Sequence, residues 1–140
     1  MSDEKWLAEV SWAGGYLFLG SDQEGHSVVY DSTSSKQRGI SPMRALLTDL
    51  GACTGMDIVA ILGKRKQKLT SLKILLWGER PEHGYPKPWQ TISLKYVLSG
   101  EKLERKYIEE AINDSSARFC SVAATLKPGV KITYSYDLVE

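Results

Sequence analysis

The sequence predicts an α+β fold with largely antiparallel sheet, on three observations. Apolar and polar residues alternate along several short stretches, which is typical of half-buried strands. One long stretch, residues 41–62, is apolar nearly all round, as expected of a buried helix. No repeat, linker or low-complexity segment divides the 140 residues. We therefore expect a single domain spanning residues 1–140.

The N-terminal part of the chain predicts a three-stranded antiparallel meander. Gly14 and Gly15 are typical of a hairpin turn between the first two strands. The segment 31–39, DSTSSKQRG, is polar and rich in turn-forming residues, so we expect an exposed loop there. The alternation places the strands over residues 5–12, 16–19 and 26–30.

The stretch 41–62, SPMRALLTDLGACTGMDIVAIL, predicts the central helix. Ser41 suits the N-cap, and Pro42 suits the first helical position, where a missing N–H is tolerated. The length would suit a membrane span, but charged residues within it are costly in lipid: Arg44, Asp49 and Asp57. We expect a buried helix in a soluble protein.

The C-terminal half predicts further strands and two helical segments. Residues 103–115 have apolar side chains at helical spacing, which indicates an amphipathic helix. Residues 113–116 are expected to break it and to supply caps for a short helix containing Cys120 to Leu126. Ser99-Gly100 should end one strand. The strands are expected over residues 72–80, 89–98 and 130–138.

Composition excludes several classes of function. A net charge of +1 gives no reason to expect binding to nucleic acid or to an anionic membrane. The N-terminus lacks a secretory signal, and two cysteines are too few for a disulfide scaffold, so we expect a cytoplasmic protein. His26 and His83 lie in separate predicted turns, and no metal-ligand spacing or phosphate-binding glycine motif is present. We expect no metal and no cofactor.

The two cysteines are the candidate reactive groups. A thiol reacts as the thiolate, so a functional cysteine needs a neighbour that lowers its pKa. Cys53 lies deep inside its helix among small residues, and Arg38 in the preceding loop is the candidate cation for it. Cys120 lies near a predicted helix start beside Arg118, so local electrostatics make it the more acidic thiol. From the residues alone, it is equally good to interpret the two cysteines as reactive thiols or as buried structural residues.

Two motifs carry a resemblance to a known family. Ser41–Leu47 (SPMRALL) with Leu50–Asp57 (LGACTGMD) resembles the first signature of the OsmC/Ohr family. Ser115–Val122 (SSARFCSV) resembles the second signature. The chain is most similar to the OsmC-like branch with the Gly-Ala-Cys-Thr-Gly-Met-Asp type of motif, and the resemblance covers nearly the whole sequence.

The resemblance implies a structure and an activity. It implies an intertwined homodimer, with antiparallel sheets wrapped around long central helices and active sites at the subunit interface. It also implies reduction of organic hydroperoxides, with Cys53 as the peroxidatic thiolate and Cys120 as the resolving thiol. An external dithiol would reduce the resulting disulfide. The candidate substrate-binding residues are the apolar ones in or beside these motifs, Met43, Leu50, Met56 and Phe119.

One departure from the family pattern keeps alternatives open. Family peroxidases pair an arginine with a glutamate that follows the helix-opening proline directly or one residue later. Here those two positions hold Met43 and Arg44, and no arginine precedes Arg38. The alternatives are a non-enzymatic dimer that binds a small apolar ligand near Cys53, and a redox sensor in which disulfide formation changes partner binding.

Overall fold

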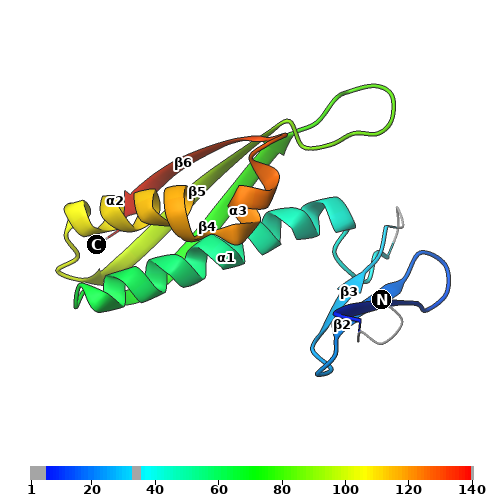
Figure 1. Ribbon diagram of the computed structural model, residues 1–140, viewed down its shortest axis with the longest axis horizontal. Helices are drawn as coiled ribbons and strands as arrows, with labels where there is room; N and C mark the ends of the chain where they lie inside the picture. Colours follow the sequence, from blue (N-terminus) through cyan, green and yellow to red (C-terminus); the bar gives the residue numbers. More distant parts are fainter. Residues whose placement is uncertain (1–5, 33–35, 140) are drawn as a thin grey trace. The chain divides into compact units, whose positions relative to one another are not determined.

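The structure is a computed structural model that describes residues 6–32 and 36–139. It confirms a mixed α+β fold with two three-stranded sheets and a long helix between them in the sequence (Figure 1). The chain divides into two compact units, residues 1–46 and 47–140, and each is described by itself. The expectation of a single domain stays a prediction.

The first unit contains the predicted meander. Its strands are β1 (Ala8–Trp12), β2 (Phe18–Asp22) and β3 (Ser27–Tyr30), paired antiparallel in that order. Gly14 and Gly15 have φ values of 96° and 58°, the left-handed conformations that the predicted turn requires. Several apolar residues of this sheet are exposed, including Val10 at 63% and Trp12 at 69%.

The predicted loop of residues 31–39 is partly organised by a buried carboxylate; its residues 33–35 lie outside the described residues. Asp31 is only 1% exposed, and its carboxylate accepts hydrogen bonds from the backbone N–H groups of Ser32 (2.7 Å) and Arg38 (3.1 Å). Ile40 then forms a parallel bridge with Tyr30. The expectation of a fully exposed loop is therefore wrong at Asp31.

The central helix, α1, spans Pro42–Lys64 and begins at the predicted proline. With a mean hydropathy of 1.6 it could cross a membrane by length and composition, but the core helix of a soluble protein passes the same test. Leu50, Ile58 and Leu62 lie in the core of the second unit. Met56 and Val59 are 72% and 55% exposed. In the single chain the helix is therefore buried on one face and exposed on the other, and burial nearly all round is not met without a partner.

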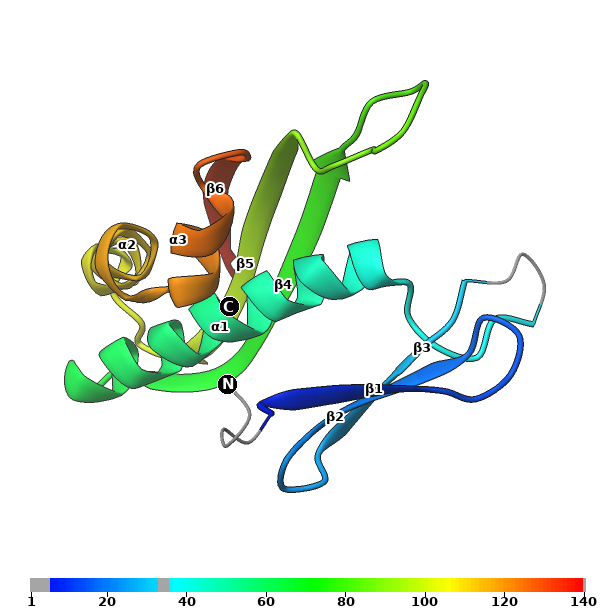
Figure 2. The same ribbon diagram turned by 45° about the vertical axis from the view of Figure 1, so that its right-hand side comes forward.

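The second unit contains a sheet of β4 (Lys68–Glu79), β5 (Thr91–Glu101) and β6 (Lys131–Leu138), in that order. β4 and β5 are antiparallel, as predicted, but β5 and β6 are parallel. The parallel pairing arises because helices connect β5 to β6 and return the chain to the same end of the sheet. α1, α2 and α3 pack on one face of this sheet (Figure 2).

β5 does not end at Ser99-Gly100, as the sequence predicted, but continues to Glu101. The reason is a close backbone approach, since a Cβ atom on Gly100 would lie 2.1 Å from the carbonyl oxygen of Lys68. Glycine here permits pairing with β4 and does not mark a turn. β4 likewise begins four residues before the predicted start, at Lys68.

The second helical region is continuous where a break was predicted. Helix α2 (Arg105–Asp114) runs directly into a π-helical turn, η1 (Ser115–Phe119), and α3 (Ser121–Leu126) follows after Cys120. The expectation that Ser115 caps the short helix is wrong, because its buried hydroxyl is used in contacts with Thr54 and Asp57. Cys120 itself caps α3, its sulfur accepting a hydrogen bond from the Ala123 N–H at 3.4 Å.

Candidate functional site

The second unit brings the two cysteines together. Cys53 is half-buried on α1, and Cys120 is 4% exposed at the junction of η1 and α3. Both are free thiols, and Cys53 lies close enough to Cys120 to act on its thiol. Residues far apart in the sequence thus form a dithiol pair in which one member is accessible and the other is enclosed.

The environment of Cys120 favours its protonated form. Burial raises the pKa of the Cys120 thiol to about 11, and the neighbouring Cys53 thiol and the negative charge of Asp57 act in the same direction. The Ala123 N–H opposes this shift but is outweighed. The expectation that Cys120 is an acidic thiol is therefore wrong, because loss of hydration exceeds the effect of the short helix that it caps.

A chain of four buried or half-buried polar side chains lies beside the dithiol. The Thr54 hydroxyl lies 2.7 Å from the Tyr96 hydroxyl and 2.8 Å from the Ser115 hydroxyl. Ser115 in turn donates to the Asp57 carboxylate at 2.8 Å. Tyr96, Thr54 and Ser115 are at most 1% exposed, so these hydrogen bonds are shielded from water.

The number of hydroxyl protons determines which group donates in each of these hydrogen bonds. Ser115 has one hydroxyl proton and donates it to Asp57, so Thr54 must be the donor to Ser115. Thr54 has then used its own proton, and Tyr96 must donate to Thr54. Burial raises the pKa of Tyr96, consistent with a phenol that keeps its proton. We call Tyr96, Thr54, Ser115 and Asp57 the hydroxyl chain.

Ser115 also holds the backbone of Cys120. Its carbonyl oxygen accepts the Cys120 N–H at 2.9 Å, which closes the π-helical turn. Such turns occur frequently at functional sites in helices. Sequence analysis did not find the roles of Thr54, Tyr96 and Ser115, because the π-turn that buries Ser115 has no local sequence signal. Thr54, Asp57 and Ser115 stood in the two recognised motifs, but nothing marked them as partners of each other or of Tyr96.

Tyr134 lies next to this group but outside the hydroxyl chain. Its ring is nearly parallel to that of Tyr96, with centroids 6.4 Å apart and an interplanar angle of 9°. Its hydroxyl is buried and has no hydrogen-bond partner among the residues that the structure describes. Burial, together with the charge of Cys120, raises the pKa of Tyr134.

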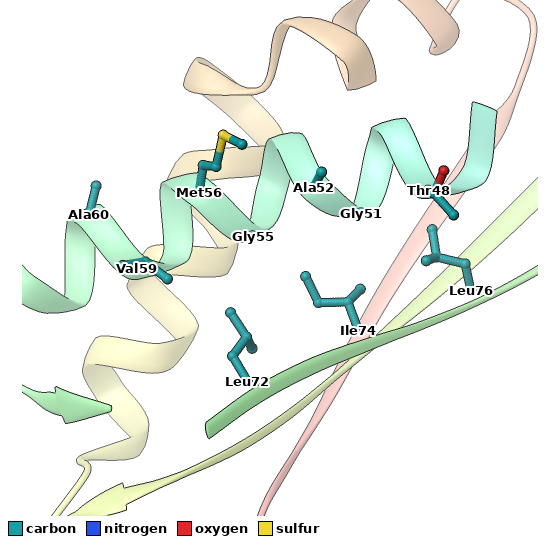
Figure 3. A pocket seen from close by; sticks show the side chains of 10 residues that line it. All are labelled: Thr48, Gly51, Ala52, Gly55, Met56, Val59, Ala60, Leu72, Ile74 and Leu76. Carbon is teal, nitrogen blue, oxygen red and sulfur yellow. The ribbon is translucent and has the colours of Figure 1, made fainter. Parts of the chain in front are cut away.

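An apolar groove of about 690 Å³ lies between α1 and β4 (Figure 3). On β4, Leu72, Ile74 and Leu76 point toward the helix. Two glycines of α1 allow the side chains of β4 to approach the helix closely. A Cβ atom on Gly55 would lie 3.0 Å from the Ile74 side chain, and a Cβ atom on Gly51 would lie 3.1 Å from the Leu76 side chain. The helix contributes Thr48, Gly51, Ala52, Gly55, Met56, Val59 and Ala60 to the lining, and Cys53 is not among the lining residues.

The other candidate residues from the sequence are dispersed. Leu50 is fully buried in the core, Met56 lines the groove, and Phe119 is 51% exposed with the Arg118 guanidinium 5.1 Å from its ring centroid. Met43 is half-buried near the start of α1. Substrate contact by any of them stays a prediction.

Arg38 belongs to the first unit, where Asp31 holds it. Besides the backbone hydrogen bond, the Nε atom of Arg38 lies 3.6 Å from the Asp31 carboxylate, and the arginine side chain is 63% exposed. Arg38 and Asp31 therefore form an arginine–carboxylate pair. Activation of Cys53 by Arg38 stays a prediction. In the described parts of the chain, no cluster of three or more His, Cys, Asp or Glu residues could hold a metal ion.

Comparisons with known proteins identify the family and the fold. The family model described as OsmC-like protein matches residues 34–135. Protein YhfA of Escherichia coli K12 is 34% identical over 132 residues, which cover 94% of this chain and 97% of YhfA. A hypothetical protein of Aquifex aeolicus VF5, known from a crystal structure, is 32% identical with a TM-score of 0.85 and 97% coverage of both chains.

A more distant structure shares the fold alone. The organic hydroperoxide resistance protein OhrB of Bacillus subtilis is 16% identical, with a TM-score of 0.64, over 94% of this chain and 98% of OhrB. The family match covers more than half of the chain and includes both cysteines. The chain therefore belongs to the OsmC-like protein family.

Proposed function

We propose that this protein is a thiol-dependent peroxidase that reduces organic hydroperoxides. The observation that carries the proposal is the pair of neighbouring free thiols, with Cys53 partly exposed and Cys120 enclosed. Membership of a fold that includes an organic hydroperoxide resistance protein supports the choice of substrate. No cofactor is needed, because the two sulfur atoms and an external dithiol can carry both electrons.

The reaction has three balanced steps. The Cys53 thiolate attacks the terminal peroxide oxygen, the O–O bond breaks, and the alkoxide takes a proton to leave as an alcohol. Cys120 then attacks the Cys53 sulfenic acid, so that an S–S bond forms, the S–O bond breaks, and the Cys120 proton leaves with the hydroxyl as water. An external dithiol reduces the disulfide by thiol–disulfide exchange.

The environments of the thiols suit these roles. A peroxide can reach only a sulfur that solvent reaches, which favours Cys53 as the attacking group. Cys120, with its pKa near 11, is a poor first nucleophile at neutral pH but lies next to the sulfenic acid that it must attack. Arg38, paired with Asp31, is our candidate for the cation that stabilises the Cys53 thiolate.

We propose that the working form is a homodimer in the cytoplasm, where thiols stay reduced. The apolar residues of the N-terminal sheet and the groove beside α1 are open in the single chain. Exposed apolar side chains gathered in this way favour a covering partner. A second copy of this chain is the partner that the family resemblance implies.

Peroxide consumption tests the proposal. Cumene hydroperoxide loss is followed with dithiothreitol as the reductant, using wild type, Cys53→Ser and Cys120→Ser. Wild type should turn over, Cys53→Ser should be inactive, and Cys120→Ser should accumulate a Cys53 sulfenic acid that a dimedone-type reagent traps. Absence of thiol-dependent consumption by the wild type would refute the peroxidase.

The groove favours a second candidate, a dimer that binds a small apolar ligand without chemistry. Inactive wild type that stays dimeric and binds a fluorescent apolar probe would favour this function. A third candidate is a redox sensor, which requires an intramolecular disulfide at sub-stoichiometric oxidant. Mass spectrometry after brief peroxide treatment detects that disulfide, and its absence would rule the sensor out.

A further inference from the structure

We propose that the hydroxyl chain positions Cys120 for disulfide formation with Cys53, through the buried contact of Thr54 on α1 with Ser115 in the π-turn. The proposal deepens the proposed function and rests on it for its biological use. Thr54 and Ser115 are positioning residues in this scheme, because neither one reacts.

The hydroxyl chain joins the two segments that carry the cysteines. Thr54 follows Cys53 directly, so its 2.8 Å contact with Ser115 ties the reactive turn of α1 to η1. The Ser115 carbonyl oxygen then holds the Cys120 N–H at 2.9 Å. Two consecutive hydrogen bonds therefore link the residue beside one thiol to the backbone of the other, in a region closed to water.

The ends of the hydroxyl chain make this link rigid. Asp57 accepts from Ser115, and Tyr96 on β5 donates to Thr54, so each hydroxyl has a single orientation that satisfies its neighbours. Tyr96 is anchored in the core of the sheet, where it is fully buried. Both Thr54 and Asp57 lie on α1, so Ser115 is held from two points of the same helix.

Position matters because the resolving step is sensitive to geometry. The Cys120 sulfur must approach the Cys53 sulfur in line with the breaking S–O bond. A displacement of about 1 Å can slow such an intramolecular step about 100-fold. A π-turn is an uncommon backbone form, so loss of its side-chain anchor should allow Cys120 to move.

The test measures how readily the disulfide forms without peroxide. Each variant is equilibrated with reduced and oxidised glutathione, and the effective concentration of the two thiols is obtained from the fraction of Cys53–Cys120 disulfide. We expect Thr54→Val and Ser115→Ala to lower this value at least tenfold. Thr54→Ser keeps the hydroxyl and should stay within threefold of wild type.

A neighbouring serine supplies a matched control. The Ser116 hydroxyl donates only to the Asn113 carbonyl oxygen, at 3.2 Å, so Ser116→Ala should stay within threefold of wild type. Wild-type values for both Thr54→Val and Ser115→Ala would overturn the proposal. An equal loss in Thr54→Ser and Thr54→Val would also overturn it, because packing and not the hydroxyl would then be responsible.

A milder pair covers the case in which a variant fails to fold. Tyr96→Phe removes the outer hydroxyl of the chain, whereas Tyr134→Phe removes a hydroxyl that has no hydrogen-bond partner among the described residues. Tyr96→Phe should lower the effective concentration at least threefold and Tyr134→Phe should leave it unchanged. The opposite order, or no difference, would contradict the proposal.

A second readout separates positioning from activation. In a Cys120→Ser background, the rate of Cys53 sulfenic acid formation should stay within threefold when Thr54→Val is added, and a tenfold fall would overturn the proposal. The glutathione equilibrium does not depend on peroxide turnover. An inactive wild type with the expected glutathione results would therefore refute the peroxidase and leave the positioning role standing.

Discussion

Replacing Thr54 with valine should destabilise the protein by about 2–4 kcal/mol. Valine keeps the shape of threonine but removes the hydroxyl that contacts both Tyr96 and Ser115. The Tyr96 hydroxyl would then be buried without its acceptor, at a cost of about 1–3 kcal/mol. Ser115 would lose one bond, worth about 1 kcal/mol, but would keep Asp57.

Urea denaturation at fixed protein concentration measures this change, because association would otherwise alter the apparent stability. The double variant Thr54→Val with Tyr96→Phe removes the orphaned hydroxyl, so it should be more stable than Thr54→Val alone by about 1 kcal/mol. Thr125→Val is the control, since the Thr125 hydroxyl is exposed and donates to the Ser121 carbonyl oxygen. A Thr54→Val protein within about 0.5 kcal/mol of wild type would refute the reasoning.

Three further predictions concern the sheet, the thiol and the groove. Gly100→Ala should destabilise the protein by more than about 2 kcal/mol in thermal or urea unfolding, because its Cβ would lie 2.1 Å from the Lys68 carbonyl oxygen. Gly63→Ala, with no atom within 4 Å of the new Cβ, should be neutral or stabilising, and equal effects of the two would contradict this account. In Cys53→Ser, the rate of Cys120 alkylation by iodoacetamide should rise about tenfold per pH unit above pH 7, because the raised pKa keeps the thiol protonated. The ordinary pKa of a thiol is 9, so a rate that levels off below pH 9 would contradict the raised pKa of about 11. If the groove is part of the interface of the proposed homodimer, Met56→Glu places a charge in that interface and should shift the protein to monomer in sedimentation velocity. Lys66→Glu, at an exposed residue outside the groove lining, should leave the dimer intact. An unchanged dimer in both variants would show that the groove is not the interface.

Local sequence signals predicted most of the secondary structure. The alternation in the first unit predicted its three strands, and Ser41-Pro42 predicted the start of α1. The same reasoning failed at Gly100 and at Ser115, where a residue type that is typical of turns or caps serves a tertiary contact. A glycine that admits a neighbouring backbone and a glycine that turns the chain look alike in a sequence.

The sequence by itself determined the α+β class, the position of the long apolar helix and the two cysteine motifs, because these depend on periodicity and on neighbours along the chain. Only the tertiary structure decided that Cys53 and Cys120 become neighbours, that β6 pairs parallel to β5, and that one face of α1 is open in the single chain. It also reversed the expected acidity of Cys120. Desolvation depends on everything that packs around a group, and the residues that enclose Cys120 come from distant parts of the chain.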